Sequence, residues 1–517
     1  MIKANGDRIE VQIPYSPALI EKFKQIDGKR YDPDRKVWTF PFYVKNELGS
    51  LLNADLSKID WLSKINIPEV EGLELRKHQA LGITFLVNRR KCILADGVGM
   101  GKTIQTLVAL KYLILHEHVM KAIIIVMNQS VEQWREEIIN KLHYDPENVI
   151  VAGKNHSADY QNFRRNPRAL FLIVNYEKMI IDDFEEMIKL KKVAIVLDEA
   201  TRVKNYFSAG SRKINLYRAE YLFLLTGTPI ENSPLDLYNL FSILDNGYLP
   251  NFYKFKEEYA IVETLNVRGK SIDSVVGWKN LEDLKRKTSP LILQRKREQV
   301  GGLPPLEIKD VLIEISPQER MFYELIEDEI RRRISRGKES VFSLFTVLKQ
   351  FLDDSSLLYT SKVKYLKNFN IDKIQTESSK KLKALDIVKH IKDQKIIIFT
   401  QFERMARILN QEIPDSIVYA KGSDEKVLKD FKADYKVLIS TDKGNYSLNL
   451  QEASVVINYD LPWNPARLEQ RYGRIWRDGQ TRKCTVYNFI VTDEDKIEKY
   501  VKAVLLEKQE YSKEVLQ

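Results

Sequence analysis

The chain has 517 residues, of which 44% are hydrophobic and 30% charged, as expected for a globular protein of about three domains. Lys and Arg outnumber Asp and Glu by 82 to 72, and this net charge of +10 permits a polyanionic partner without requiring one. No run approaches about 18 apolar residues, and the N-terminus lacks a signal-peptide core, so we expect a cytoplasmic protein with no membrane partner. Cys92 and Cys484 lie in apolar runs, which predicts buried free thiols rather than a disulfide or metal site.

Residues 1–62 form a predicted small α+β module that precedes the rest of the chain. Two short alternating runs predict strands, and apolar spacing over residues 17–26 predicts a helix between them. Aromatic residues interleave with basic ones in the second half of the module, which is typical of a nucleic-acid surface and equally of a mini-core with a basic rim. These aromatic residues are Tyr31, Trp38 and Phe40. The run FKQIDGKRYDPDRKVWTFP resembles the HARP-like domain of annealing helicases, and this resemblance implies binding to branched or forked DNA.

The next feature is a glycine-rich turn, LADGVGMGKT, between an apolar run and a helical pattern over residues 104–115. Strand, glycine-rich turn and helix form the context of a phosphate-binding loop, in which backbone N–H groups surround a polyphosphate. The strict pattern has glycine where this chain has Asp96, so a turn with an adventitious Lys-Thr is the alternative. The predicted nucleotide-binding residues are Asp96, Gly97, Val98, Gly99, Met100, Gly101, Lys102 and Thr103.

Within this loop, Lys102 is expected to reach the β- and γ-phosphates of ATP, and the Thr103 hydroxyl is expected to ligate Mg²⁺. Upstream, Gln79 lies on a predicted helix, where its two-sided amide could read the edge of an adenine base. The alternative for Gln79 is an exposed helical side chain.

Strand and helix patterns alternate after the loop, which predicts a doubly wound parallel sheet. One buried strand ends in Asp198-Glu199 and another in Thr226-Gly227-Thr228-Pro229. Ligands bind at the carboxyl ends of the strands in such sheets, where the loop and both motifs fall. We therefore assign Asp198 to the Mg²⁺ shell and Glu199 to the attacking water.

Residues 251–375 interrupt this alternation with long amphipathic helical patterns and basic clusters. A second strand–helix series follows, and it contains the string QRYGRIWRDGQ on a predicted helix over residues 467–476. Arg474 and Arg477 are three residues apart, so we expect them on one helix face. Arginines from a second domain would stabilise the departing γ-phosphate, although a surface salt-bridge network is the alternative.

The order of these motifs resembles that of the Swi/Snf family of superfamily-two helicase-like ATPases through most of residues 70–510. The strings that carry the resemblance are LRKHQALG, LADGVGMGKT, DEATRVKN, LLTGTPIENSPLDLYNLFSIL, PLILQRKREQVGGLPPLE, KIIIFTQF, VLISTDKGNYSLNLQEASVVINYDLPWNP and QRYGRIWRDGQ. The sequence departs from the family pattern at Thr201 and at Asn445-Tyr446-Ser447, which puts the coupling of ATP to DNA movement in doubt.

The resemblance implies an α/β fold with two RecA-like parallel-sheet lobes and helical insertions. The implied domains are a HARP-like module at 1–62, lobe 1 at 70–250, insertions and linker at 251–375, and lobe 2 at 376–517. It also implies roles for Arg76 and Gln470 in nucleotide binding and for Lys102, Glu199, Arg474 and Arg477 in catalysis, with ATP and Mg²⁺ as cofactors.

The expected function is an ATP-driven translocase on double-stranded DNA that remodels forks or branches. Alternatives are an ATPase that displaces DNA-bound proteins such as RNA polymerase, a strand-separating DNA or RNA helicase, and a non-catalytic scaffold. We expect a monomer of bacterial, phage or plasmid origin.

Overall fold

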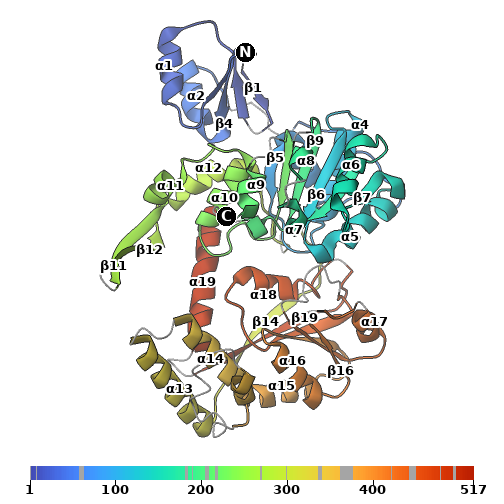
Figure 1. The fold of residues 1–517 in the computed structure, drawn as a ribbon, viewed down its shortest axis with the longest axis vertical. Helices are drawn as coiled ribbons and strands as arrows, with labels where there is room; N and C mark the ends of the chain where they lie inside the picture. Colours follow the sequence, from blue (N-terminus) through green and yellow to red (C-terminus); the bar gives the residue numbers. More distant parts are fainter. Residues whose placement is uncertain are drawn as a thin grey trace. The chain divides into compact units, whose positions relative to one another are not determined.

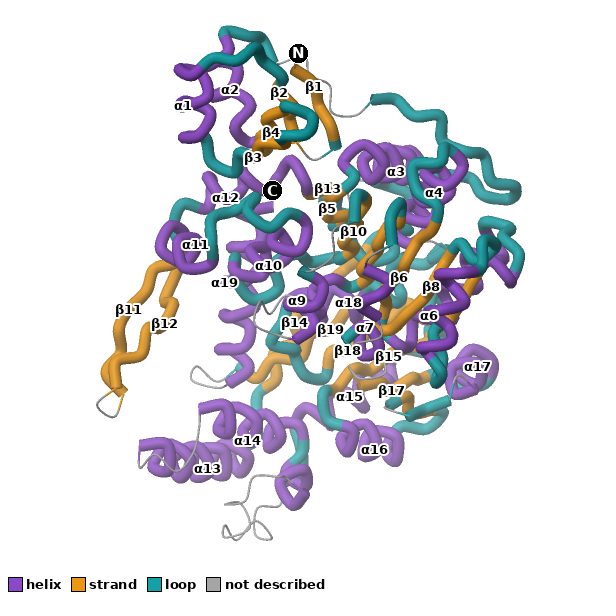
Figure 2. The backbone as a smooth tube through the Cα atoms, turned by 45° about the horizontal axis from the view of Figure 1, so that its top comes forward, coloured by secondary structure: helices purple, strands orange, loops and turns teal. Residues whose placement is uncertain are grey.

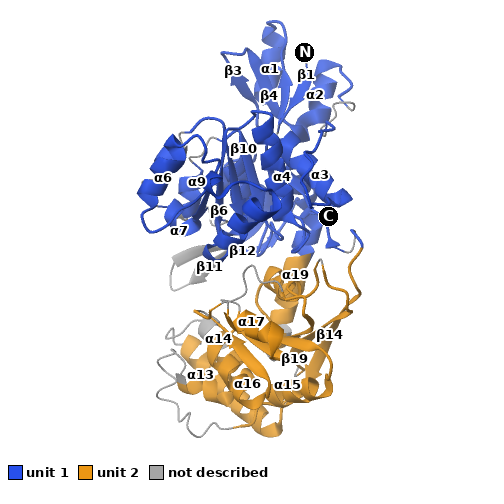
Figure 3. Ribbon diagram, turned by 90° about the vertical axis from the view of Figure 1, so that its right-hand side faces the viewer, with its two compact units in different colours: residues 1–301, 510–517 blue, residues 302–509 orange. Residues whose placement is uncertain are grey.

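The computed structural model divides the chain into two compact units, residues 1–301 with 510–517 and residues 302–509 (Figure 3). It describes residues 2–516 except 7, 57–62, 181–183, 189, 204–208, 216–218, 268–269, 298–299, 336–340, 361–375, 421, 425, 442–449, 478 and 493–496. Among the described residues, no helix is long and apolar enough to cross a membrane.

Unit 1 begins with a four-stranded antiparallel sheet of order β1-β2-β4-β3 (Figure 1). The module comprises β1 (Ile2–Asn5), β2 (Arg8–Val11), α1 (Pro17–Gln25), β3 (Arg30–Asp32), β4 (Val37–Pro41), η1 (Phe42–Val44) and α2 (Lys45–Leu52). Its core contains Phe23 and Phe40, whose rings meet edge to face at 5.0 Å, and Trp38 packs on the same Phe23 ring. Trp38 and Phe40 therefore belong to the mini-core, whereas Tyr31 is 49% exposed.

The larger part of unit 1 is a seven-stranded parallel sheet of order β13-β5-β10-β9-β6-β8-β7. Its strands are β5 (Lys91–Leu94), β6 (Lys121–Val126), β7 (Val149–Val151), β8 (Phe171–Asn175), β9 (Val193–Asp198), β10 (Tyr221–Leu225) and β13 (Ile292–Leu293). Successive residues of each strand face opposite sides of the sheet, and both sides are apolar, so helices must cover both.

Helices pack on both faces of this sheet, as Figures 1 and 2 show. One core includes residues of α3 (Lys77–Arg89), α4 (Lys102–Leu115), α5 (Val131–Glu136) and its π-helical continuation η3 (Glu137–Lys141). The other includes residues of α6 (His156–Arg165), α7 (Tyr176–Met179), α8 (Glu185–Ile188), η6 (Ala200–Val203), α9 (Ala209–Ile214) and α10 (Leu235–Leu244). The predicted doubly wound sheet is confirmed.

Unit 1 also contains a helical and hairpin segment after α10. It consists of α11 (Phe252–Tyr259), the antiparallel hairpin β11 (Ala260–Val267) and β12 (Lys270–Trp278), α12 (Leu281–Thr288) and η7 (Ser289–Leu291); the remaining short helices are η2 (Asn128–Ser130) and η4 (Pro146–Asn148). The unit division thus falls inside the segment 251–375, and the domain boundaries inferred from the sequence stay predictions.

Unit 2 contains a six-stranded parallel sheet of order β14-β19-β18-β15-β17-β16. Its strands are β14 (Leu306–Ile313), β15 (Lys395–Thr400), β16 (Ser416–Tyr419), β17 (Val437–Thr441), β18 (Ala453–Asn458) and β19 (Cys484–Val491). The strand β14 comes from the stretch that the sequence assigned to the insertions and linker. Its charged residues Glu307, Lys309 and Asp310 interrupt the continuous apolar run by which a buried parallel strand is recognised in a sequence.

The helices of unit 2 are α13 (Pro317–Ser335), α14 (Val341–Asp353), η9 (Ser355–Thr360), α15 (Ser379–His390), α16 (Glu403–Glu412), α17 (Lys426–Ala433) and α18 (Pro465–Tyr472). The last helix, α19 (Ile497–Leu516), begins in unit 2, and its final residues count with unit 1. Cys92 and Cys484 are buried free thiols, as predicted.

Candidate nucleotide site

The glycine-rich turn connects β5 to α4, as the sequence predicted. Gly99 and Gly101 have φ angles of +79° and +78°, a backbone region that L side chains rarely adopt. These angles turn the chain sharply into the first turn of α4, where N–H groups lack partners within the helix. The Lys102 Nζ donates a hydrogen bond to the Asp96 carbonyl oxygen at 2.7 Å and so lies over the turn.

The glutamine predicted to read adenine lies at the start of α3. The Gln79 Oε1 accepts a hydrogen bond of 3.0 Å from the Arg76 N–H, which is an ordinary length, and so caps the helix. A β-carbon placed on Gly101 would lie 2.5 Å from the Gln79 Nε2, so this amide is packed directly against the glycine-rich turn. The neighbouring His78 ring is within 3.1 Å of the Met100 carbonyl oxygen. The start of α3 and the turn are therefore in contact.

The carboxylate pair lies at the carboxyl end of β9. The Asp198 side chain accepts hydrogen bonds from the Trp134 indole N–H at 2.9 Å and from the Glu199 backbone N–H at 3.1 Å. Glu199 has a φ angle of +51°, which is uncommon for a residue other than glycine, asparagine or aspartate. Such strained backbone positions occur at functional sites, where the surrounding structure holds them.

The strands that carry the three motifs are neighbours in one register. Leu225 of β10 pairs with Asp198 of β9 on one side and with Leu94 of β5 on the other. The Thr226-Gly227 turn consequently leaves the sheet between the other two motifs. A β-carbon placed on Gly227 would lie 3.8 Å from the Lys102 Nζ. Residues far apart in the sequence thus converge at one edge of the sheet.

Burial controls the electrostatics of this edge. Loss of solvation lowers the pKa of the Lys102 amine, an effect that the negative charges of Glu199, Asp96 and Asp198 oppose. Loss of solvation also raises the pKa of the Asp198 carboxyl, against the hydrogen bond from Trp134 and the charge of Lys102. A half-buried carboxylate whose pKa is raised in this way is typical of a metal or charge-binding site.

Mg²⁺ prefers oxygen ligands and usually takes one or two from the protein, with water and phosphate completing the shell. The Asp198 carboxylate and the Thr103 hydroxyl form a donor set of this kind, on two neighbouring motifs. Among the described residues, no group of three or more His, Cys, Asp and Glu side chains could hold a metal ion by itself, so water and phosphate would have to supply further ligands. The residues present therefore fit Mg²⁺ that arrives with a nucleotide.

Three contributors to this edge were not identified from the sequence. Trp134 and Tyr176 hold Asp198, the latter by a hydrogen bond of 2.7 Å from its hydroxyl to the Asp198 carbonyl oxygen. Arg295 holds the Asp96 carboxylate, which is fully buried. Trp134 and Tyr176 belong to none of the quoted strings. Arg295 lies in PLILQRKREQVGGLPPLE, but nothing in that string pairs it with Asp96, so only the folded chain shows these contacts.

The predicted arginines lie in unit 2, where the structure corrects their setting. The helix α18 ends at Tyr472, because Gly473 leads into a series of turns, so Arg474 and Arg477 do not share a regular helix face. Arg474 is buried, and its carbonyl oxygen accepts the Leu450 N–H at 3.2 Å. Gln470 is half-buried on α18. Their roles toward a nucleotide stay predictions.

Of the sequence departures, Thr201 is buried in η6, directly after the carboxylate pair. Three features noted in the sequence lie outside the described residues. They are the segment Asn445-Tyr446-Ser447, the Lys204-Asn205 pair that ends the string DEATRVKN, and the basic cluster of Lys362, Lys364 and Lys367.

Two parallel-sheet lobes, one with a glycine-rich loop beside a carboxylate pair, define a RecA-like, ATP-hydrolysing class of enzyme. Comparison with known families then identifies the group. The SNF2-related domain matches residues 64–398, the helicase conserved C-terminal domain residues 377–479 and the HepA-related protein (HARP) domain residues 9–52. The chain belongs to the SNF2-related family of ATP-dependent helicase-like enzymes.

Relatives with curated names agree with this assignment. An uncharacterized ATP-dependent helicase, YqhH of Bacillus subtilis, is 30% identical over 90% of this chain and 85% of its own length. A putative ATP-dependent helicase/translocase of the same organism, YwqA, is 28% identical over 92% of this chain but only 52% of its own length. A solved SWI2/SNF2 ATPase core of Sulfolobus solfataricus in complex with double-stranded DNA is 22% identical over 87% of this chain and 95% of its own, with a TM-score of 0.42.

Proposed function

We propose that this enzyme moves along double-stranded DNA at the expense of ATP and remodels forked or branched DNA. The observation that carries the proposal is the convergence of the glycine-rich loop, the Asp198-Glu199 pair and the Thr226-Gly227 turn at one sheet edge in a SNF2-related chain. Members of this class use ATP binding and hydrolysis to drive motion, so a DNA-dependent ATPase is the simplest activity for the site.

In this proposal N–H groups of the glycine-rich loop and of the first turn of α4 surround the phosphates of ATP, and Lys102 pairs with the β- and γ-phosphates. Asp198 and Thr103 hold Mg²⁺, which neutralises phosphate charge when bound. Glu199 orients the attacking water and accepts its proton. Arg76, Gln79 and Gln470 are assigned to nucleotide binding, and Arg474 and Arg477 to stabilisation of the charge on the departing phosphate.

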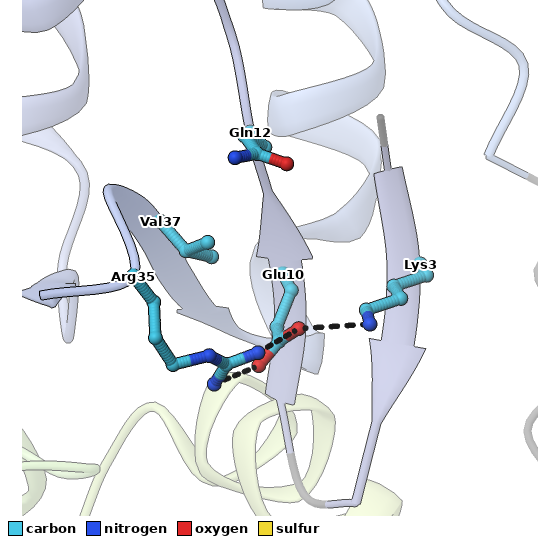
Figure 4. Close-up of a pocket in the computed structure, with 5 residues that line it drawn as sticks. All are labelled: Lys3, Glu10, Gln12, Arg35 and Val37. Atoms are coloured by element: carbon cyan, nitrogen blue, oxygen red, sulfur yellow. Dashed lines mark hydrogen bonds and ion pairs between the residues drawn. The ribbon is translucent and has the colours of Figure 1, made fainter.

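The N-terminal module is proposed to favour forks or branches through basic side chains rather than through stacking. Phe40 is buried in the module's core, which leaves Tyr31 as its exposed aromatic residue among those predicted. Lys29, Arg35 and Lys36 are exposed. The Lys3 Nζ lies 3.5 Å from the Glu10 Oε2, and the Arg35 NH1 lies 2.8 Å from the Glu10 Oε1. Figure 4 shows both side chains directed at Glu10.

Glu10 limits how much positive charge this face presents. Burial alone would raise the pKa of Glu10, but hydrogen bonds from Arg35 and Asn5 and the nearby charges of Arg35 and Lys3 outweigh burial and lower it. Glu10 therefore stays ionised at neutral pH and offsets part of the basic face. DNA phosphates would compete for the same two cations, so contacts there would be salt-dependent.

The module contacts the larger part of unit 1 through a buried carboxylate. The Arg8 NH1 lies 2.7 Å from the Asp245 Oδ2, and Arg30 pairs with the other Asp245 oxygen. The Tyr43 hydroxyl donates a hydrogen bond to the Tyr248 carbonyl oxygen at 3.2 Å. These contacts support a module that works together with the ATPase lobe.

The test measures ATP turnover with single-stranded, duplex and forked DNA and with RNA, for the wild type and Glu199→Gln. Duplex DNA should stimulate turnover, forked DNA should stimulate it more, and Glu199→Gln should lower the stimulated rate by about 10²–10⁴-fold. Stimulation by RNA alone would contradict the proposal.

Two further assays distinguish the alternatives. A labelled third strand displaced from duplex DNA without separation of the two duplex strands supports translocation, whereas release of single strands would assign a strand-separating helicase. A variant lacking residues 1–62 should lose the preference for forks and keep the stimulation by duplex DNA.

A further inference from the structure

The segment that follows η7 runs along the glycine-rich loop as a continuation of the lobe 1 sheet. Leu293 of β13 pairs in parallel with Leu94 of β5. Beyond the paired residues, the Ala95 N–H donates to the Leu293 carbonyl oxygen at 2.7 Å and the Gly97 N–H to the Arg295 carbonyl oxygen at 3.2 Å. The loop is therefore tied to this segment through its backbone.

The Arg295 side chain crosses to the acidic residue that replaces the expected glycine. Its Nε lies 2.8 Å from the Asp96 Oδ1, and its NH2 lies 2.5 Å from the Asp96 Oδ2, which is a bidentate pair. The Asp96 side chain is fully buried and that of Arg295 is 14% exposed. Removal of one partner would leave a buried charge without its counter-ion.

The pair is the centre of a network that joins α3, α4 and the far end of the loop. Arg295 donates to the His78 carbonyl oxygen on α3 and to the Gln105 Oε1 on α4, the latter at 3.1 Å. The Gln105 Nε2 donates to the Asp96 Oδ2 at 3.0 Å and to the Met100 carbonyl oxygen at 3.2 Å. Both ends of the loop, at Asp96 and Met100, are thus held from the same place.

A glycine in the middle of α3 makes room for this network. A β-carbon on Gly82 would lie 1.7 Å from the Gln105 Oε1 and 3.1 Å from the Arg295 NH2. No side chain fits there while Gln105 keeps its position. A glycine inside a helix lowers helix stability, so its presence here is explained by the space that the network needs.

We propose that Arg295 is a positioning residue that presets the glycine-rich loop for the phosphates of a nucleotide. It fixes Asp96, whose carbonyl oxygen accepts the Lys102 ammonium, and through Gln105 it fixes the Met100 end of the loop. A loop whose backbone is already held in place loses less freedom on binding and therefore binds more tightly. This inference rests on the nucleotide site of the proposed function.

The experiment compares Arg295→Ala and Arg295→Lys with the wild type by titration of fluorescent Mg-ADP and by ATPase kinetics on duplex DNA. Arg295→Ala should raise the ADP Kd and the ATP KM on the order of 10–100-fold, with a smaller change in kcat. Arg295→Lys should recover only part of the affinity, because one ammonium cannot span both carboxylate oxygens. Gly82→Ala, which displaces Gln105 while Arg295 is intact, should raise the KM in the same direction.

Arg286→Lys is the matched control, since Arg286 pairs with Asp283 at 2.7 Å in the same unit but is 55% exposed and lies apart from the loop. It should leave Kd and KM unchanged. A folded Arg295→Ala variant whose Kd and KM stay within twofold of the wild type would overturn the inference. If Arg295→Ala does not fold, the same criterion applies to Arg295→Lys and Gly82→Ala.

The two proposals fail in different ways. If Glu199→Gln and Lys102→Ala retain full ATP turnover, the proposed function fails. If these variants lose turnover while the Arg295 variants keep wild-type nucleotide affinity, only the positioning role fails.

Discussion

Carboxylates that have lost solvation occur in both units, but their surroundings compensate this loss differently. In unit 2, the Lys380 Nζ lies 2.6 Å from the Asp353 Oδ1 and pairs also with Glu498, and all three side chains are at most 1% exposed. In unit 1, the hydrogen bonds to the Asp198 carboxylate described above come from two neutral donors, the Trp134 indole and the Glu199 backbone N–H. Burial raises the pKa of Asp198. The unit 2 carboxylates are thus paired with a lysine of the protein itself, whereas Asp198 is available to a cation that arrives with a ligand.

The unit 2 cluster extends toward the string that the sequence singled out. The Lys349 Nζ donates to the Leu461 carbonyl oxygen at 2.6 Å, and the adjacent Asp460 lies 3.6 Å from the Arg471 NH2. Burial raises the pKa of Asp353, while the charges of Lys349, Arg471 and Lys380 outweigh burial and lower the pKa of Asp460. The neighbouring cations therefore outweigh burial at Asp460 but not at Asp353.

The largest expected effect on stability comes from removal of the lysine at the centre of the unit 2 cluster. Lys380→Met removes the cation and leaves the Asp353 and Glu498 carboxylates facing each other, which should cost about 3–5 kcal/mol of the free energy of unfolding. Urea unfolding followed by tryptophan fluorescence measures this loss. Lys381→Met is the control, because its neighbouring ion pairs at 3.5 and 3.8 Å involve a more exposed amine. Equal loss in both variants would contradict the comparison.

A smaller loss is expected where the two parts of unit 1 meet. Asp245→Ala leaves the buried Arg8 guanidinium without its carboxylate, which should cost about 1.5–3 kcal/mol. The variant should also reduce the preference for forked DNA in the ATPase assay. Glu21→Gln is the control, because Glu21 pairs with Lys24 at 2.7 Å within the module and both side chains are exposed. Unchanged stability and fork preference in Asp245→Ala would show that this contact is dispensable.

Substitution of Asp198 should raise the free energy of unfolding rather than lower it. Asp198→Asn keeps an oxygen for the Trp134 N–H and removes a charge that burial disfavours, so it should abolish ATP turnover while raising stability by about 0.5–2 kcal/mol. The folded-state pKa of Asp198 lies above the unfolded value, so its ionisation costs stability as pH rises through that interval. The gain should therefore be larger at the higher pH and shrink as the solution is acidified. Denaturant unfolding of the two proteins at pH 8 and pH 5 tests this sign.

The smallest effect is expected from a partly exposed ion pair. Burial would raise the pKa of Asp283, but hydrogen bonds from Tyr259, Arg286 and Lys287 lower it to about 2. A lowered pKa contributes stability that is present at neutral pH and is lost as pH falls from about 4 toward 2. Asp283→Asn should therefore cost at most about 1 kcal/mol at pH 7, since solvent screens the group, and less at pH 3. Thermal unfolding at the two pH values measures the difference, and an equal loss at both would contradict it.

Much of the fold and part of the site could be predicted because the signals are local. Apolar strand runs such as residues 395–400 need no distant partner to be recognised. The strand, glycine-rich turn and helix around Lys102 predict a phosphate loop, although Asp96 breaks the strict pattern and the other motifs were needed to decide. The prediction was wrong about the helical setting of Arg474 and Arg477, because the helix ends at Tyr472 rather than at residue 476. It also missed β14, because an edge strand with charged residues lacks the pattern of a buried one.

The sequence by itself determined the parallel-sheet architecture, the family and the loop that ends at Lys102 and Thr103, since these follow from periodicity and from residue spacing over a few turns of chain. Only the tertiary structure decided that Trp38 packs on Phe23 in the module's core and that Asp96 is held by Arg295. The physical reason is distance along the chain: Arg295 lies 199 residues from Asp96, and a bidentate contact between them exists only once β13 has joined the sheet beside β5.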